Sequence, residues 1–593
     1  MSAYSVIMIA GLTNFVARFP SLYWLTGPIF DKELRVSSRR KRNYFLRVAY
    51  IWLLTAFIGL AWIFMAKQGG SASMVYQLSR MSETGKYVTV TIVWFQFIAI
   101  QLLAIVMLSA AISDEIYRRT LGLLMTTPIS SLQIVIGKLF SKLLQLVLLL
   151  AISMPILSVV RVLGGVSWDY VVSSLCVTLT AAIFAGSIGL ALSITNRHSH
   201  TVIVRTFLLC FLFYIVPAIV LPLLQFVYQI RINAEMILFY VNPFVAMGIL
   251  TRSMLSPAMT AIGLSWPLHC AVMLGISALL LAFSTVRVRK AGLRQATGQA
   301  GIFASRTERR LADGKVSKKT VLYASSRRTR PVKGPPVIWK EIINLWIKSR
   351  RLTVVAASVL AVLLLAAVYG YCGYKGYLDH EETHIVFILA FFFFGLFRTA
   401  SSAATCITSE KEALTWPILL TTPLTEKQIA FGKIIGSCIG GWAFWLLLAA
   451  HVVVFSLAGC ISPSAILPLA LLIAGSMLLV SAVGVLFSSC FKRSSISASI
   501  NIILFLFFTM PVCCPTPLPI FLVSPLFAAV LILGVTGDWD IMAGPFRQAS
   551  NQWGWFGTFM VSGIALIILV AIYLSLALGA FAIAVANIRR RTF

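Results

Sequence analysis

The sequence predicts an all-α polytopic membrane protein with about twelve transmembrane helices, arranged as two parallel six-helix repeats. Three observations predict this fold class. Of the 593 residues, 59% are hydrophobic and only 11% are charged, whereas a soluble domain carries roughly 25% charged residues. Long stretches such as 143–152 and 500–508 contain no charged residue at all. A motif in the first half of the chain also recurs in the second half at a fixed distance.

The predicted spans are apolar segments of about 20 residues, the length that an α-helix needs to cross the hydrocarbon core. The chain divides into an interfacial N-terminal segment (1–26), a first six-helix half (27–286), a basic cytosolic linker (287–335) and a second six-helix half (336–593). The predicted spans are 48–66, 88–113, 134–160, 168–195, 201–228 and 262–286, then 352–372, 384–409, 428–458, 464–490, 496–523 and 556–586.

The chain is strongly basic, with 49 Lys and Arg against 18 Asp and Glu and a net charge of +31. Such a charge is common in nucleic-acid-binding proteins. Here, however, the basic residues occupy short stretches between apolar segments. The predicted topology gathers the basic clusters on one side of the membrane and leaves the charges of the other side nearly balanced, as the positive-inside rule requires. We therefore expect a multi-pass protein of the plasma membrane (a bacterial inner membrane), with both termini cytoplasmic. The expected surroundings are the lipid bilayer, and no nucleic-acid partner is expected.

The internal repeat is clearest after the second predicted span of each half. Residues 112–138 align with residues 407–433 at a constant offset of 295 without a gap. Pro128 and Pro423 should stop a helix, because proline has no N–H donor and clashes with the preceding turn. The following segments, 130–133 and 425–428, match the capping-box pattern that begins a new helix. Each half is therefore predicted to carry a helix, a break and a capped helix at the cytosolic membrane surface.

This repeated motif resembles one found in a known family. Glu, Leu-Leu-x-Thr-Thr-Pro, Gln-Ile and Gly-Lys follow one another in residues 115–138, and nearly the same pattern occupies residues 410–433. It is similar to the membrane subunits of ABC-2-type ATP-driven transporters, notably the multicopper-enzyme-maturation-like permease group. The resemblance implies two permease halves fused in one chain. It also implies that two copies of a separate ATPase hydrolyse ATP to drive substrate movement, and that the direction of transport is export.

The resemblance also implies roles for individual residues. The turn after the second span would form a coupling helix that fits a groove on the ATPase, and the amphipathic helix before the first span would form an elbow beside it. Glu115 and Arg119 are expected to face solvent, and Pro417 is expected to break the second copy of the coupling helix. The implied coupling residues are Glu115, Arg118, Arg119, Thr127, Pro128, Glu410, Glu412, Thr422 and Pro423, and the implied elbow residues are Glu33, Arg39, Glu341 and Arg350.

The sequence contains no G-x-x-x-x-G-K-[ST] nucleotide-binding loop, because the Gly-Lys pairs at 137–138 and 432–433 lack its remaining residues. We therefore do not expect this chain to be an enzyme or to hold a cofactor. A twelve-helix secondary transporter of the 6+6 type is the main alternative, since it would have the same topology. No span, however, carries a clear proton-relay carboxylate.

A second alternative is a membrane metallohydrolase, because His380-Glu381-x-x-His384 matches the H-E-x-x-H metal motif. No third ligand is evident nearby, so a polar helix start at the outer surface is the simpler interpretation. Cys372 and Cys460 are expected near the same outer face, and their spacing leaves pairing open.

Two further features are singled out by their position in the membrane. Arg398 is the only Lys or Arg well inside an apolar span, which makes it a candidate for an intramembrane cavity. Segments 232–256 and 523–551 are apolar but interrupted by Asn242-Pro243 and Ser524-Pro525. We expect short helices there that re-enter or lie on the outer leaflet.

Overall fold

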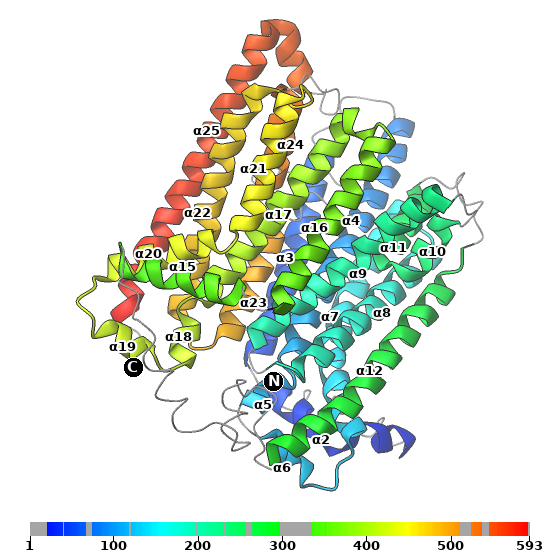
Figure 1. Cartoon of the computed structure of the whole chain (residues 1–593). Helices are drawn as coiled ribbons and strands as arrows, with labels where there is room; N and C mark the ends of the chain where they lie inside the picture. Colours follow the sequence, from blue (N-terminus) through cyan, green and yellow to red (C-terminus); the bar gives the residue numbers. More distant parts are fainter. Residues whose placement is uncertain are drawn as a thin grey trace. The chain divides into compact units, whose positions relative to one another are not determined.

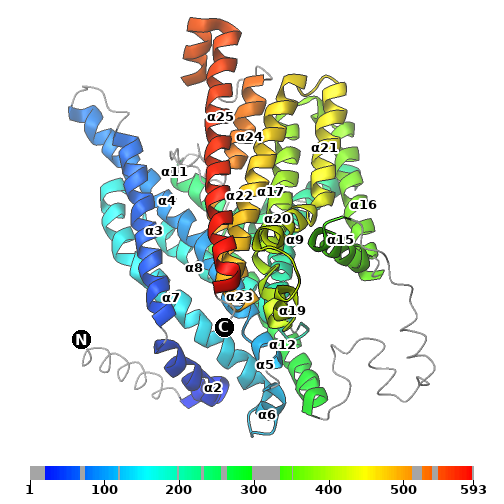
Figure 2. The same cartoon turned by 90° about the vertical axis from the view of Figure 1, so that its left-hand side faces the viewer.

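The structure is a computed structural model that consists of two compact units, Met1–Arg328 and Thr329–Phe593. Within the residues that it describes, every regular element is a helix (Figures 1 and 2). The described residues are 20–39, 41–66, 74–117, 120–196, 199–228, 233–255, 264–296, 334–349, 352–509, 524–536 and 545–590.

Unit 1 is built around α4 and α8, which pack against each other, and α4 and α8 each also contact α7. The short helix α2 packs on α7, and the end of α12 packs on α6. The helices are α2 (Pro20–Ser38), α3 (Lys41–Ala66), α4 (Met74–Ser109), α5 (Ser113–Tyr117), α6 (Leu121–Met125), α7 (Ser131–Gly164), α8 (Trp168–Ser193), α9 (Ser199–Tyr228), α10 (Ala234–Val241), α11 (Pro243–Leu255) and α12 (Trp266–Ala296).

Unit 2 has the same plan, with α17 packed on α22 at its centre and α25 along the other side of α22. Helix α15 runs across the long helices and packs on α20 (Figure 1). The helices are α15 (Pro336–Ser349), α16 (Leu352–Tyr374), η2 (Tyr377–Asp379), α17 (Glu381–Thr405), α18 (Thr408–Glu412), α19 (Trp416–Leu420), α20 (Glu426–Ile439), α21 (Trp442–Leu457), η3 (Pro463–Ala465), α22 (Ile466–Cys490), α23 (Ser494–Thr509), α24 (Pro525–Thr536) and α25 (Pro545–Arg590).

Every predicted span overlaps with an apolar helix or a bent helix pair, and residues 510–523 of the predicted span 496–523 lie outside the described residues. Eight described helices are long and apolar enough to cross a membrane, and α20 and α21, which are bent by 55° to each other, meet the same test as a pair. The remaining three predicted spans coincide with the shorter apolar helices Arg47–Ala56, Ala361–Tyr374 and Ser494–Leu506. The all-α polytopic fold class is therefore confirmed, and about twelve spans fit the structure.

The predicted interruption at Asn242-Pro243 is also present. Helices α10 and α11 meet there at an angle of 112°. Asn242 stabilises the bend, because its Nδ2 donates to the Tyr214 carbonyl at 2.7 Å and its Oδ1 accepts from the Phe244 N–H at 3.0 Å. In unit 2, α24 is the corresponding short helix, and residues 537–544 lie outside the described residues.

Two predicted boundaries differ from the structure. Helix α12 continues to Ala296, so the start of the predicted linker 287–335 is helical, and residues 297–333 lie outside the described part of the chain. Helix α25 covers Pro545–Arg590 and is thus longer at both ends than the predicted span 556–586. Most of the predicted N-terminal segment, residues 1–19, is likewise not described.

Candidate functional site

The repeated motif forms the same structure in both units. In unit 1 we call residues 113–130 hairpin 1, which contains α5 and α6, and in unit 2 we call residues 408–425 hairpin 2, which contains α18 and α19. Helices α18, α19 and α20 begin 295 residues after α5, α6 and α7, and α18 and α19 also end 295 residues after α5 and α6. The alignment found in the sequence is therefore also an alignment of helix boundaries.

The sequence of each hairpin explains why its second helix ends so soon. Thr127 Oγ1 donates to the Leu124 carbonyl at 2.6 Å, and Thr422 Oγ1 donates to the Leu419 carbonyl at 2.5 Å. These bonds satisfy carbonyls that lose their helical partners, because the next residue is proline. A complete capping box then begins the following helix in both units, as predicted, with Ser130 and Gln133 in α7 and Thr425 and Gln428 in α20.

The expectation that Pro417 breaks hairpin 2 is wrong. Helix α19 spans Trp416–Leu420 and matches α6 residue for residue, with Pro417 in its first turn. Proline is tolerated there, because the first N–H groups of a helix have no intrahelical acceptor. The two hairpins therefore offer surfaces of the same backbone shape.

The elbow helices begin at a proline in both units. Helix α2 is interrupted at Gly27, whose φ of 60° is left-handed, and Pro28 then starts the part that packs on α7. Helix α15 starts at Pro336. We call the segments Pro28–Ser38 and Pro336–Ser349 elbow 1 and elbow 2.

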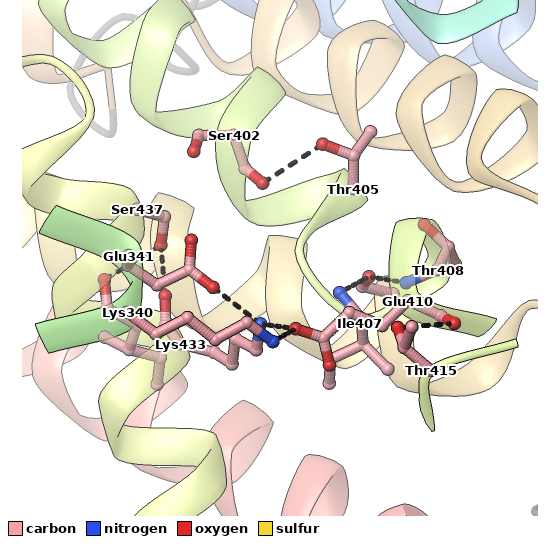
Figure 3. A network of polar contacts seen from close by, with 12 residues as sticks. Lys340, Glu341, Ser402, Thr405, Ile407, Thr408, Glu410, Thr415, Lys433 and Ser437 are labelled. Atoms are coloured by element: carbon pink, nitrogen blue, oxygen red, sulfur yellow. Dashed lines mark hydrogen bonds and ion pairs between the residues drawn. The ribbon is translucent and has the colours of Figure 1, made fainter. Parts of the chain in front are cut away.

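A group of four charges, with Lys433 and Glu410 buried, joins elbow 2, hairpin 2 and α20 (Figure 3). Lys433 Nζ lies 2.6 Å from Glu341 Oε1 in the elbow and 2.6 Å from Glu410 Oε1 in the hairpin. Lys340 Nζ approaches the same Glu410 oxygen at 2.7 Å. Only 1% of the Lys433 side chain is exposed, so its charge depends on these carboxylates.

In unit 1, the elbow glutamate and the hairpin glutamate pair with two different lysines of α7. Lys138 Nζ lies 2.7 Å from Glu115 Oε1 in hairpin 1 and also donates to the Ala111 carbonyl. Glu33 of elbow 1 pairs instead with Lys142, one helical turn further along α7, at 3.3 Å. Each carboxylate thus has its own lysine within the described residues.

The expectation that Glu115 faces solvent is wrong. Its side chain is 20% exposed, and the equivalent Glu410 side chain is 10% exposed. The alternating charges of the motif suggested a solvated surface, but the lysine of each Gly-Lys pair folds back onto the glutamate. A lysine ammonium buried this far needs such a partner, because the cost of desolvating an unpaired charge is several kcal/mol.

Other charged residues attach each hairpin to the helix of the fifth predicted span in the same half, which is α9 in unit 1 and α23 in unit 2. Glu412 Oε1 accepts from the Ser494 N–H at 2.7 Å at the start of α23, and Ser199, at the start of α9, donates to Asp114 Oδ1 at 2.8 Å. An acid near a helix N-terminus is favoured by the helix dipole. Glu412 is therefore a helix cap within this chain, and the coupling contact expected at this residue stays a prediction.

Three large apolar side chains are exposed on the hairpins beside exposed threonines and prolines, and the sequence reasoning missed them. Leu123 is 73% exposed and Ile418, its counterpart 295 residues later, is 66% exposed. Leu414 is 78% exposed and has a left-handed φ of 57°, the only such value at a non-glycine residue in the described part of the chain. The missed signal is an apolar residue at matching positions of the two short helices α6 and α19.

The remaining predicted residues fall into two groups. Thr127, Pro128, Pro423 and Arg39 are exposed at the hairpins and at the end of elbow 1, and Thr422 is half-buried. Arg118, Arg119 and Arg350 lie outside the described residues.

The H-E-x-x-H segment does not form a metal centre among the described residues, where no three His, Cys, Asp or Glu side chains are close enough to hold an ion. His384 is buried and its Nε2 is hydrogen-bonded to the Leu378 carbonyl at 2.9 Å. His451 packs beside it and is hydrogen-bonded to Tyr369 Oη at 2.6 Å. Both rings therefore belong to an aromatic cluster of α16, α17 and α21.

Two single residues complete the sequence predictions. Arg398 lies half-buried in α17, and no hydrogen bond or ion pair to it is found among the described residues. Cys372 and Cys460 are both free thiols.

A comparison with known families agrees with this geometry. The family described as "ABC-2 family transporter protein" matches residues 28–293 and 336–515, which together are more than half of the chain. Both matched segments begin at the proline that starts an elbow helix. No curated protein and no solved structure matches the chain. The chain is thus a multi-pass membrane protein that belongs to the ABC-2 family of transporter proteins, with two permease halves fused in one polypeptide.

Proposed function

We propose that this chain is the permease of an ATP-driven transporter and that a separate ATPase, in two copies, docks on hairpin 1 and hairpin 2. The observation that carries the proposal is the pair of exposed apolar side chains, Leu123 and Ile418, on hairpins of identical helix boundaries. An exposed apolar side chain on a short helix can enter a hydrophobic groove of a partner protein, a common mode of helix recognition.

Each hairpin is held against the long helices of its unit by ion pairs or by packing contacts. Helix α5 is held by the Glu115–Lys138 pair, and α18 is held by Glu410, while α6 rests on the end of α12, where Met125 contacts Gly292. A push on the hairpin tip would therefore reach several long helices as a rigid-body movement.

The charge distribution supports a cytoplasmic position of the hairpins. Arg39 at the end of elbow 1 and Arg289 and Lys290 near the end of α12 are exposed, and the end of α12 is the part that contacts hairpin 1. Basic residues beside membrane spans favour the cytoplasmic side. We propose on this basis that hairpins and termini are cytoplasmic, that the membrane is the plasma membrane, and that transport is export, the direction that the family resemblance implies.

The test is co-purification of the full chain with the ATPase encoded beside it. Leu123→Asp and Ile418→Asp should each reduce the ATPase recovered by about tenfold, because a hot-spot residue contributes at least about 1.4 kcal/mol. Tyr374→Asp is the matched control, since Tyr374 is 75% exposed at the end of α16, away from hairpin 2, and should leave recovery unchanged. Full recovery with the Leu123/Ile418 double variant would remove the docking assignment and favour the secondary-transporter alternative.

A further inference from the structure

The Gly-Lys pair of the second repeat lies where three elements of unit 2 meet. Lys433 belongs to α20, Glu341 to elbow 2 and Glu410 to hairpin 2, and the lysine ammonium contacts both carboxylates. Lys340 adds a direct link from the elbow to the hairpin through Glu410. The group is electrically neutral, with two lysines and two glutamates.

Glycine at two positions of α20 lets elbow 2 come this close. A Cβ atom at Gly432 would lie 2.8 Å from Val337 Cβ, and a Cβ at Gly436 would lie 2.8 Å from Glu341 Cβ. Such contacts are shorter than the 3.5–4.0 Å of ordinary carbon–carbon packing. Gly436 therefore allows Glu341 to reach Lys433.

The equivalent of Gly436 in unit 1 is Ser141, and the equivalent of Ser437 is Lys142, both at the offset of 295. A side chain at position 141 excludes the close approach seen in unit 2, and Glu33 pairs with Lys142 one turn away. Lys138 serves the hairpin carboxylate, Glu115. In unit 2, Lys433 alone thus contacts both the elbow glutamate and the hairpin glutamate. In unit 1, Lys142 contacts the elbow glutamate and Lys138 contacts the hairpin glutamate.

We propose that Lys433 is a positioning residue that fastens elbow 2 and hairpin 2 together, so that they move as one body, whereas in unit 1 the elbow and the hairpin are fastened to α7 by separate lysines. The inference rests on the proposed function in one respect: the hairpin is the part that receives the movement of the ATPase. The proposal means that the elbow and the hairpin are linked directly in unit 2 but only through α7 in unit 1.

The test is hydrogen–deuterium exchange of the full-length permease without any ATPase, read from peptides of each elbow and each hairpin. In Lys433→Gln, exchange should rise by about tenfold in both 336–349 and 408–420, because both carboxylates lose their shared partner. In Lys138→Gln the rise should be confined to 113–125, and in Lys142→Gln to 28–38. A Lys433→Gln protein in which only one of the two segments loosens would overturn the proposal.

Two milder variants keep the test decisive if Lys433→Gln does not fold. Glu341→Gln leaves the Lys433–Glu410 pair in place, and Gly436→Ser displaces the elbow without removing a charge. Each should raise exchange in elbow 2 and, to a smaller extent, in hairpin 2, and an unchanged hairpin would contradict the junction. Ser141→Gly in unit 1 is the matched control and should leave exchange in elbow 1 unchanged.

Measuring ATPase binding and ATP turnover separates the proposed role of Lys433 from effects on folding and on ATPase docking. Glu341→Gln should bind as much ATPase as the unchanged protein, because Ile418 is untouched, but ATP turnover in the recovered complex should change by about fivefold or more. Unchanged turnover together with unchanged exchange would refute the fastening role. Loss of ATPase binding in the Leu123 and Ile418 variants, measured separately, concerns the docking proposal alone.

Discussion

Replacing Gly484 with alanine should destabilise unit 2 where α17 crosses α22. The new Cβ would lie 2.5 Å from Ala403 Cβ and 3.1 Å from the Ala404 backbone nitrogen. Carbon atoms pack at 3.5–4.0 Å, so the two helices must separate by about 1 Å. Neither neighbouring atom belongs to the flexible end of a long side chain. Overpacking of this kind costs about 1–3 kcal/mol.

Gly579→Ala is the matched control on α25. No atom lies within 4 Å of its added Cβ, so this variant should gain up to about 1 kcal/mol from the higher helix propensity of alanine. The two variants should therefore differ in thermal midpoint by roughly 5–10 °C, measured in one detergent by intrinsic fluorescence. Equal midpoints would show that the α17–α22 contact is looser than the structure indicates.

Three other predictions concern the bend, the hairpin and the first unit. Asn242→Ala should lower the free energy of unfolding by about 1–3 kcal/mol, since it leaves buried polar backbone groups at the α10–α11 bend unpaired; a denaturant titration that shows no change would contradict this. Leu414→Gly should relieve about 1–2 kcal/mol of left-handed backbone strain yet weaken ATPase recovery, and stronger recovery would argue against a docking role for this leucine. Gly189→Ala, the counterpart of Gly484→Ala, should cost less, because its nearest contact is Ser109 Oγ at 3.0 Å, and a midpoint as low as that of Gly484→Ala would contradict the difference.

The sequence was sufficient to predict most of the fold. Apolar length located each span, and the Asn242-Pro243 pair located the bend between α10 and α11. These features depend on local properties, namely the hydropathy of one segment and the missing N–H of one proline. Pro417 shows the limit of the same local rule, because its effect depends on where the helix begins, and the helix begins one residue before it.

The candidate site was predicted only in part, because burial depends on residues that are distant in the sequence. Glu410 is buried by Lys433 and Lys340, which lie 23 and 70 residues away from it. The motif itself contains the glutamate and the Gly-Lys pair, but its spacing alone does not show that they meet. The exposed Leu123 and Ile418 were overlooked for the opposite reason, since apolar residues near a membrane segment are expected to be buried.

The repeat is informative because the two copies differ in a way that the structure explains. A duplicated motif that only connected two spans would need neither a buried lysine nor a glycine that allows the elbow helix to pack closely. Unit 2 retains both, with Gly432 against Val337 and Lys433 between two carboxylates. Unit 1 has a serine at the position of Gly436 and carries the elbow pair on Lys142. Differences at two adjacent positions, Ser141 against Gly436 and Lys142 against Ser437, thus account for the change of ion-pair register. The mechanical difference between the halves therefore follows from packing and from the position of one lysine.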